Sequence, residues 1–281
     1  VVAVLDTGVR FDHRDLRRLA AGGNLLPGYD MIDDVDVAND GDGRDADPSD
    51  PGDWLTLAEV QQVGGPFEDC DTNAEDSSWH GTQTSGLIGA LTNNGIGMAS
   101  VARNVRVLPV RVLGKCGGFD SDIIAGMRWA VGLAVADVPA NPNPARVLNL
   151  SLGGDGRCNA AYQDVMTEIS AAGAVVVAAA GNSTGHAVSM PANCTGVIAV
   201  AGLRHVGTKV GFSDLGREIA ISAPAGNCVD TGPNDPCRYP ILTMSNSGLT
   251  VLVTDAAASS IYTDSFNASL GTSFSAPLVA G

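Results

Sequence analysis

The sequence predicts an α/β fold of three layers, with a mostly parallel central sheet flanked by helices. Two observations support this prediction. Short, continuously apolar runs typical of buried parallel strands recur along the chain, and helix-like segments lie between them. Strands that alternate with helices pair in parallel through right-handed crossovers, so functional residues are expected at the carboxyl ends of the strands.

The expected strands are apolar runs rich in valine, leucine, isoleucine and alanine. They cover residues 1–5, 105–113, 147–150, 174–179 and 197–201. Asp6 closely follows the first run, Ser151 the third and Asn182 the fourth. These three residues are therefore expected at one edge of the sheet.

The expected helices cover residues 80–91, 122–135 and 160–172, and a last helix opens at Ser273. The second of them places Ile123, Met127, Ala130 and Ala134 on one face. The third ends at Gly173, because glycine readily adopts the left-handed conformation that terminates helices.

Length and charge limit the classes of function. The 281 residues, 44% of them hydrophobic, suit one domain over residues 1–281 with a sizeable core. The chain opens inside an expected strand and stops inside an expected helix, so we expect a segment of a longer precursor, truncated at both ends.

The net charge of −15 argues against nucleic acid or an anionic membrane as partner and permits bound cations. No apolar run is long enough to cross a membrane.

The chain has an even number of cysteines, and none of them forms a C-x-x-C pair. This pattern favours disulfides over zinc and therefore an oxidising compartment, with six buried thiols of a cytosolic protein as the alternative. Cys228 and Cys237 flank a short loop and suit a local bridge, whereas the sequence alone leaves the other pairs open. The remaining cysteines are Cys70, Cys116, Cys158 and Cys194.

Three polar residues have the side chains that nucleophilic catalysis requires. Asp6 lies in "DTG", His80 in "HGTQTSG" and Ser273 in "GTSFSAPLVAG". A serine hydroxyl is a weak nucleophile that needs a base, usually a histidine, whose tautomer a carboxylate fixes. Each residue alone is as well explained as a helix cap or turn residue. The three together, in the order Asp, His, Ser, indicate a catalytic triad.

These motifs resemble those of the subtilisin-like serine proteases, the subtilase family, of the bacterial secreted type. "VAVLDTGV", "HGTQTSG" and "GTSFSAPLVAG" resemble its three catalytic motifs, and "SLGG" and "AAAGN" its substrate strand and oxyanion segment. The resemblance implies that Asp6 orients His80, that His80 is the general base and that Ser273 is the nucleophile. Asn182 would donate its amide to the oxyanion, together with the backbone N–H of Ser273.

The implied function is a secreted, extracellular serine endopeptidase that hydrolyses peptide bonds through an acyl-enzyme. Its partners would be polypeptide substrates and a pro-segment that is cleaved off, and we expect a monomer. The substrate is expected to bind as an added strand against two edges of the cleft. The residues implied for these edges and for the first pocket are Gly117, Gly118, Ser151, Leu152, Gly153, Ala179 and Gly181.

The substrate-binding assignments leave two points open. Gly117 and Gly118 are equally typical of an ordinary turn. The stretch from Ser183 to Cys194, which would form the floor of the first pocket, is shorter than in familiar members of the family, so side-chain preference stays open.

The resemblance also guides the remaining disulfides. Cys158 follows the "SLGG" edge and Cys194 closes the segment after "GNS", so both lie beside the first pocket and we expect them to pair. Cys70 and Cys116 would then join the loop before His80 to the "CGG" edge.

Structural Ca²⁺ is expected at two places. The first is the stretch 30–53, which holds ten aspartates and one basic residue. Oxygen ligands favour calcium, although the stretch lacks the terminal glutamate of an EF-hand, and a solvated acidic loop without an ion is the alternative. The candidate ligands there are Asp40, Asp42, Asp45 and Asp47.

The second calcium site is implied by the resemblance. Asp15 would bind together with the loop "LTNNGIGM", whose plain alternative is an Asn-Gly turn. One extra residue in this loop allows Asn93 to replace Asn94. The implied loop ligands are the carbonyls of Leu91, Ile96 and Met98 and the side chain of Asn94.

Two other functions compete with this interpretation. One is a catalytically silent peptide-binding module on the same fold. The other is a nucleotide-binding α/β protein, which the sequence disfavours because it lacks both G-x-G-x-x-G after the first run and G-x-x-x-x-G-K-[ST].

Overall fold

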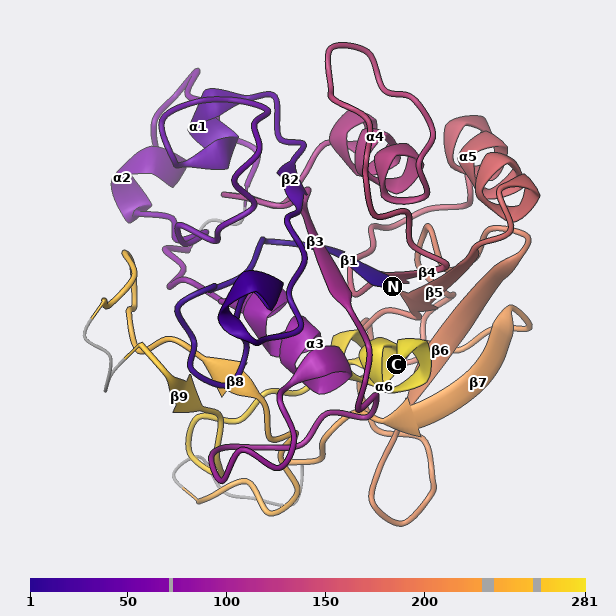
Figure 1. Cartoon of the computed structure of the whole chain (residues 1–281). Helices are drawn as coiled ribbons and strands as arrows, with labels where there is room; N and C mark the ends of the chain where they lie inside the picture. The colour runs from indigo at the N-terminus through magenta and orange to yellow at the C-terminus, as the bar shows by residue number, and fades with distance from the viewer. Residues whose placement is uncertain (71–72, 229–234, 255–258) are drawn as a thin grey trace.

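The computed structural model describes residues 1–70, 73–228, 235–254 and 259–281. Within them, a seven-stranded sheet with the order β2-β3-β1-β4-β5-β6-β7 runs through the centre, and every pairing in it is parallel (Figure 1). The strands are β1 (Val2–Asp6), β2 (Tyr29–Asp30), β3 (Val107–Arg111), β4 (Val147–Leu150), β5 (Val175–Ala179), β6 (Val197–Leu203) and β7 (Ile219–Pro224). The order reverses at β1, so β3 and β4 lie on either side of the strand that ends in Asp6.

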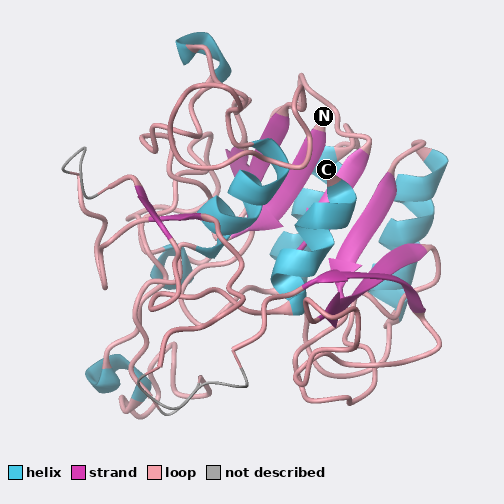
Figure 2. Ribbon diagram, turned by 90° about the horizontal axis from the view of Figure 1, so that it is seen from below, coloured by secondary structure: helices cyan, strands magenta, loops and turns pink. Residues whose placement is uncertain are grey.

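Helices cover both faces of the sheet, as Figure 2 shows. One face packs against α3 and α6, and the other against α4 and α5. The bounds are α3 (His80–Gly89), α4 (Asp120–Ala130), α5 (Ala160–Ala171) and α6 (Thr272–Ala280). The three-layer α/β prediction is confirmed.

Successive residues of β1 show why both faces are apolar. Val2 and Val4 point into the cluster with Ile88 of α3 and Ala276 of α6. Ala3 and Leu5 point to the opposite side, into the cluster that α4 and α5 complete. Because side chains alternate along a strand, a run that is apolar throughout can be buried only between two layers.

Shorter elements lie in the loops around the sheet. They are a 3₁₀ turn (Leu19–Ala21), α1 (Val35–Ala38), α2 (Leu57–Val60) and an antiparallel pair of β8 (Met244–Ser245) and β9 (Ile261–Tyr262). Sequence patterns did not predict these elements, nor β2 and β7, because β2 has only two residues and β7 is a half-exposed edge strand. Among the described residues, no helix is long and apolar enough to cross a bilayer.

The helix expected over residues 122–135 begins and ends earlier than its pattern suggested. It ends at Ala130, because Gly132 adopts a φ of +87° and the chain turns there, with the N–H of Leu133 donating to the carbonyl of Arg128. Ala134 is therefore exposed rather than on the buried face.

The structure joins the six cysteines in three disulfides. The Cα–Cα separations are 5.8, 5.0 and 4.7 Å for Cys70–Cys116, Cys158–Cys194 and Cys228–Cys237, respectively. These are the pairs expected above. The first anchors the loop between α2 and α3 to the turn after β3, beside the candidate site.

Candidate active site

The four residues expected to act in catalysis lie at the carboxyl edge of the sheet. Asp6 ends β1, His80 begins α3, Asn182 follows β5 and Ser273 lies in the first turn of α6. The parallel connections between the strands therefore bring residues as far apart as 6 and 273 to one edge. This is where a parallel α/β sheet exposes side chains and loop backbone to a ligand.

Asp6 and His80 are joined by a hydrogen bond of 2.7 Å between Nδ1 of the histidine and Oδ1 of the aspartate. Asp6 is buried, and it also accepts from the N–H of Thr7 at 2.8 Å and the hydroxyl of Thr84 at 3.1 Å. These three hydrogen bonds hold the carboxylate in place beside the imidazole. With Nδ1 donating to Asp6, the Nε2 of His80 is left to accept a proton.

Burial and neighbouring charges shift the pKa of His80 in opposite directions. Burial alone lowers the pKa of His80, but the charge of Asp6 and the hydrogen bond to it outweigh burial, with smaller contributions from Asp53 and Asp50. The net pKa of His80 is raised above 6.5. The imidazolium that forms when His80 takes a proton is therefore stabilised at this site.

The close approach of α3 to β1 depends on Gly81. A Cβ at this position would lie 2.0 Å from the carbonyl oxygen of Gly8, so only glycine fits without displacing the helix. Thr7 fastens the same junction, because its hydroxyl donates to Asp50 at 2.7 Å and accepts from the N–H of Gly81 at 3.0 Å.

Ser273 is held by the end of β4. Its hydroxyl donates to the carbonyl of Ser151 at 3.1 Å, and the hydroxyl of Ser151 donates back to the carbonyl of Ser273 at 2.6 Å. The ring of Phe274, the next residue, lies 5.6 Å from the ring of His80. The Ser273 hydroxyl is thus hydrogen-bonded to Ser151, and among the described residues no hydrogen bond joins it to His80.

The side-chain amide of Asn182 and the backbone N of Ser273 both lie beside Gly271. Oδ1 of Asn182 accepts from the N–H and the hydroxyl of Thr272, at 2.9 and 3.1 Å, which directs the amide NH₂ away from Thr272. A Cβ at Gly271 would lie 3.5 Å from Nδ2 of Asn182 and 3.6 Å from the backbone N of Ser273. An oxyanion hole needs two N–H donors directed at the developing oxyanion.

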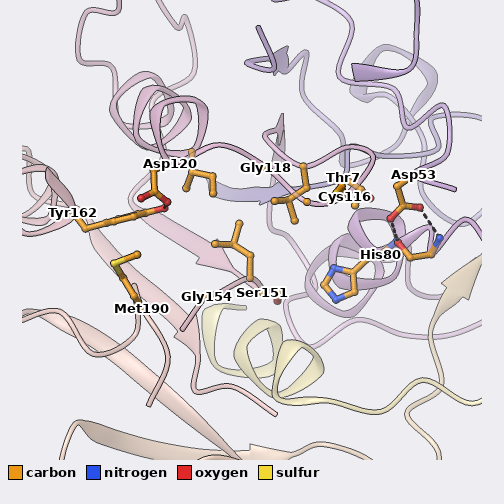
Figure 3. Close-up of a pocket in the computed structure, with 16 residues that line it drawn as sticks. Thr7, Asp53, His80, Cys116, Gly118, Asp120, Ser151, Gly154, Tyr162 and Met190 are labelled. Atoms are coloured by element: carbon orange, nitrogen blue, oxygen red, sulfur yellow. Dashed lines mark hydrogen bonds between the residues drawn. The ribbon is translucent and has the colours of Figure 1, made fainter. Parts of the chain in front are cut away.

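Two cavities adjoin these residues. One, of about 280 Å³, lies beside Ser273 and Asn182 and is walled by Ala179 and Gly181. The other, of about 460 Å³, extends from His80 along the turn at Gly117 and Gly118 (Figure 3). Ser151, Leu152 and Gly153 line both cavities, and each of the seven expected substrate-binding residues lines at least one of the two.

A profile of the subtilase family, Peptidase_S8, matches residues 1–281. The chain belongs to this family. It is 43% identical to an extracellular basic protease of Dichelobacter nodosus over 242 residues, covering 85% of this chain and 38% of that protein. It is also 43% identical to an extracellular protease of Xanthomonas campestris pv. campestris over 282 residues, which cover 100% of this chain and 42% of that protein.

Solved structures agree with this assignment. A protease from Pseudoalteromonas arctica superposes with a TM-score of 0.86 at 45% identity, covering all of this chain and 75% of that one. A cold-adapted subtilisin-like proteinase, at 24% identity and a TM-score of 0.60, shows the fold alone. The chain spans about two fifths of the length of the curated relatives it matches.

In this subtilase the acidic stretch is partly neutralised by arginines. Asp40, Asp42, Asp45 and Asp47 line one cavity of about 300 Å³. Arg111 pairs with Asp40 at 2.6 Å and with Asp30, whereas Arg44 lies 4.0 Å from Asp33 and pairs at 2.6 Å with Asp122, outside the stretch. In the part of the chain that the structure describes, no three acidic, histidine or cysteine side chains converge as a metal site.

Burial in this stretch favours protonated carboxyls. Burial raises the pKa of Asp30 to about 7, against the opposing charge of Arg111. Burial, followed by the charge of Asp53, raises the pKa of Asp50 to about 7. The pKa of Asp45 is also raised, by burial and by its acidic neighbours. Arg10 also lines the cavity of about 300 Å³. Carboxylate oxygens are the ligands that calcium prefers, and a cation would relieve the repulsion between the aspartates.

Asp15 is buried against the loop expected to share a cation with it. Its carboxylate accepts from the amide of Asn94 at 2.6 Å, the N–H of Met98 at 3.1 Å and the hydroxyl of Tyr262 at 3.1 Å. Asn93 has a φ of +61°, as in an Asn-Gly turn. The structure thus brings Asp15, Asn94 and Met98 together, and hydrogen-bond donors satisfy the carboxylate there.

Leu91 and Ile96 belong to the same loop. The N–H of Leu91 donates to the carbonyl of Asp15, and the N–H of Ile96 donates to Oδ1 of Asn94. The carbonyl groups of this loop suit a hard cation by their chemistry.

Several supporting residues were not identified from the sequence. Thr84 follows His80 by one helical turn, a spacing that places it on the same face, so the motif itself held that signal. Thr272 orients Asn182, and its place directly before Ser273 was a weaker signal. Arg111 gave no signal, because nothing in the sequence links it to residues 30 and 40.

Proposed function

We propose that this subtilase chain is the catalytic domain of a secreted serine endopeptidase. The observation that carries the proposal is the 2.7 Å bond from His80 to Asp6, at the same edge of the sheet as Ser273 in the first turn of α6 and Asn182 after β5. The relatives named as extracellular proteases support it, as do the three disulfides.

In the proposed reaction, Oγ of Ser273 attacks the carbonyl carbon of the scissile peptide while Nε2 of His80 takes its proton. The carbonyl oxygen becomes an oxyanion that the amide of Asn182 and the N–H of Ser273 stabilise. Collapse of this intermediate breaks the C–N bond, and His80 returns the proton to the leaving amine. Asp6 stays ionised throughout and holds the imidazolium.

The resulting ester between Ser273 and the substrate is the acyl-enzyme. Water then attacks its carbonyl with His80 as base, and the same oxyanion donors act again. The products are two peptides and the free Ser273 hydroxyl. The cleft lined by the backbone at residues 117–118 and 151–153 would hold the substrate extended during both steps.

We further propose structural Ca²⁺ at the acidic cavity, held by Asp42, Asp45 and Asp47 with Asp40, and at the loop of Asp15. A bound cation would neutralise carboxylates there and take no part in the chemical steps. A pro-segment that is removed before activity is also proposed, supported by the greater length of the relatives.

Hydrolysis tests this function directly. The purified protein should cleave casein or a fluorogenic peptide, and a serine-directed fluorophosphonate should abolish the cleavage. Tight binding of peptides without any hydrolysis would support the silent binding module and contradict the proposal.

A further inference from the structure

The cavity of about 460 Å³ has two chemically different ends. His80 lies at one end and Ser151 in the middle, whereas Asp120, Tyr162 and Met190 gather at the other end (Figure 3). A substrate chain extends by about 3.3 Å per residue, so these ends contact different substrate residues. The far end therefore recognises a side chain away from the scissile bond.

Asp120 presents an exposed carboxylate to this end of the cavity. Its Oδ1 accepts from the hydroxyl of Tyr162 at 3.0 Å. Burial, and then the charge of Asp120, raise the pKa of Tyr162, so the phenol keeps its proton and holds the carboxylate in place.

Asp122, on the same helical turn as Asp120, has a basic partner of the kind that Asp120 lacks. Asp122 is buried and pairs with Arg44 at 2.6 Å. Among the residues that the structure describes, no lysine, arginine or histidine forms an ion pair with Asp120. The charge of Asp120 is therefore available to a cation that the protein itself does not supply.

The other carboxylate of this cavity is already engaged. Asp53 accepts from the N–H of Ser78 at 2.7 Å and from its hydroxyl at 2.6 Å, so each of its oxygens has a donor. No lysine or arginine lines the cavity among the described residues. Asp120 is thus the group in this cavity best placed to meet a positive charge.

The surroundings of Asp120 suit a long side chain with a charged end. Tyr162, Met190 and Ile123 offer an aromatic ring, a flexible thioether and an aliphatic wall. Lysine and arginine bury their methylene stems on such surfaces and keep the charged group at a polar rim. A neutral apolar side chain would fill the same walls but would leave the carboxylate without a partner.

We propose that Asp120 selects substrates with a lysine or arginine several residues from the scissile bond. This inference rests on the proposed endopeptidase function and adds a substrate class to it. A solvent-accessible ion pair is worth up to about fivefold in affinity, so we expect up to about a fivefold preference for the basic residue.

The test uses fluorogenic peptides that differ at one position only, with lysine or its uncharged counterpart norleucine. The position is moved along both sides of the scissile bond, and kcat/KM is measured for each peptide. At one position kcat/KM for the lysine peptide should exceed that for the norleucine peptide. This ratio of the two kcat/KM values should fall as the salt concentration is raised, because salt screens exposed charges.

Asp120→Asn should bring that ratio to about one, mainly by slowing cleavage of the lysine peptide. Asp164→Asn is the matched control: it removes the same charge from an exposed site on α5, outside the cavity, and should keep the ratio. A Tyr162→Phe variant, which removes only the hydroxyl that orients Asp120, should give an intermediate ratio.

The outcomes separate this inference from the proposed function. Hydrolysis with equal lysine and norleucine rates at every position, or a ratio that Asp120→Asn leaves unchanged, overturns the inference and leaves the endopeptidase intact. If Asp164→Asn lowers the lysine-to-norleucine ratio as much as Asp120→Asn does, the preference comes from the overall charge of −15, and the inference about Asp120 is overturned. A protein that neither hydrolyses peptides nor reacts with fluorophosphonate overturns both.

Discussion

The catalytic edge and the acidic stretch 30–53 both bury carboxylates, but they stabilise them in different ways. Asp6 receives donors from Thr7, His80 and Thr84, which all lie in the catalytic motifs. Asp30 and Asp40, by contrast, depend on the positive charge of Arg111, at the end of β3. One region satisfies its carboxylate with neutral donors and the catalytic histidine, and the other with a buried cation.

This difference predicts a separation of effects. Changes at the catalytic edge remove groups that act in turnover and should leave the free energy of unfolding nearly unchanged. Changes in the acidic stretch leave a buried charge without its partner, and that lowers stability. The comparison fails if substitutions in either region lower turnover and the free energy of unfolding to the same degree.

Ser273→Ala should have the largest effect. Turnover of a peptide substrate should fall by at least about 10⁴-fold, because no nucleophile remains to form the acyl-enzyme. The midpoint of thermal unfolding should change little. Ser170→Ala, at an exposed position of α5, is the matched control and should keep full turnover.

Asn182→Ala should lower kcat by about 10²–10³-fold, a magnitude taken from the oxyanion asparagine of subtilisin, a member of the same family. KM should change much less, because the amide is needed chiefly when the oxyanion forms. Steady-state kinetics on one peptide measures both constants. A variant with unchanged kcat would show that the amide does not face the oxyanion.

Arg111→Met should have the opposite effect: it should lower stability and leave turnover by the folded protein nearly unchanged. It leaves buried Asp30 and half-buried Asp40 unpaired, and breaking a buried pair from one side costs about 3–5 kcal/mol. Arg128→Met is the control, because it removes an exposed pair with Glu168, which is worth about 0.2–1 kcal/mol. Urea unfolding measures both, and equal losses would contradict the contrast between the two regions.

Calcium removal tests the acidic stretch further. A cation that binds only the folded state adds about 2.7 kcal/mol at a hundredfold excess over its Kd, so chelation should lower Tm and speed self-digestion. Asp42→Asn with Asp45→Asn should reproduce part of that loss at saturating calcium, and Asp15→Asn a separate part. An unchanged Tm on chelation would refute both proposed calcium sites.

The smallest expected effect is a shift in pH dependence. His80 must be neutral to act as a base, and its pKa is raised above 6.5, so activity should fall as the pH drops through a value above 6.5. Asp53→Asn removes a negative charge that raises this pKa and should move the acidic limb to lower pH. A pH–kcat/KM profile that stays unchanged would refute the contribution of Asp53.

The sequence predicted the fold and placed the catalytic edge, because each depends on local patterns. Apolar runs give the strands, and Asp6 and Asn182 follow two of them directly. The pairing of Arg111 with Asp30 and Asp40 could not be predicted, because it depends on the two-residue strand β2, which places Asp30 opposite Arg111, and on the loop that carries Asp40. The position of Asp120 at the end of the cavity needed the packing of α4 against α5.

The central claim is that Ser273 is the nucleophile of an Asp6–His80–Ser273 triad. Its most direct test is mass-spectrometric mapping of the protein after reaction with a fluorophosphonate. We predict one modified peptide, carrying the adduct on Ser273, and no reaction in Ser273→Ala or in protein unfolded beforehand. An adduct on another serine, or no adduct on a folded protein that hydrolyses peptides, would contradict the claim.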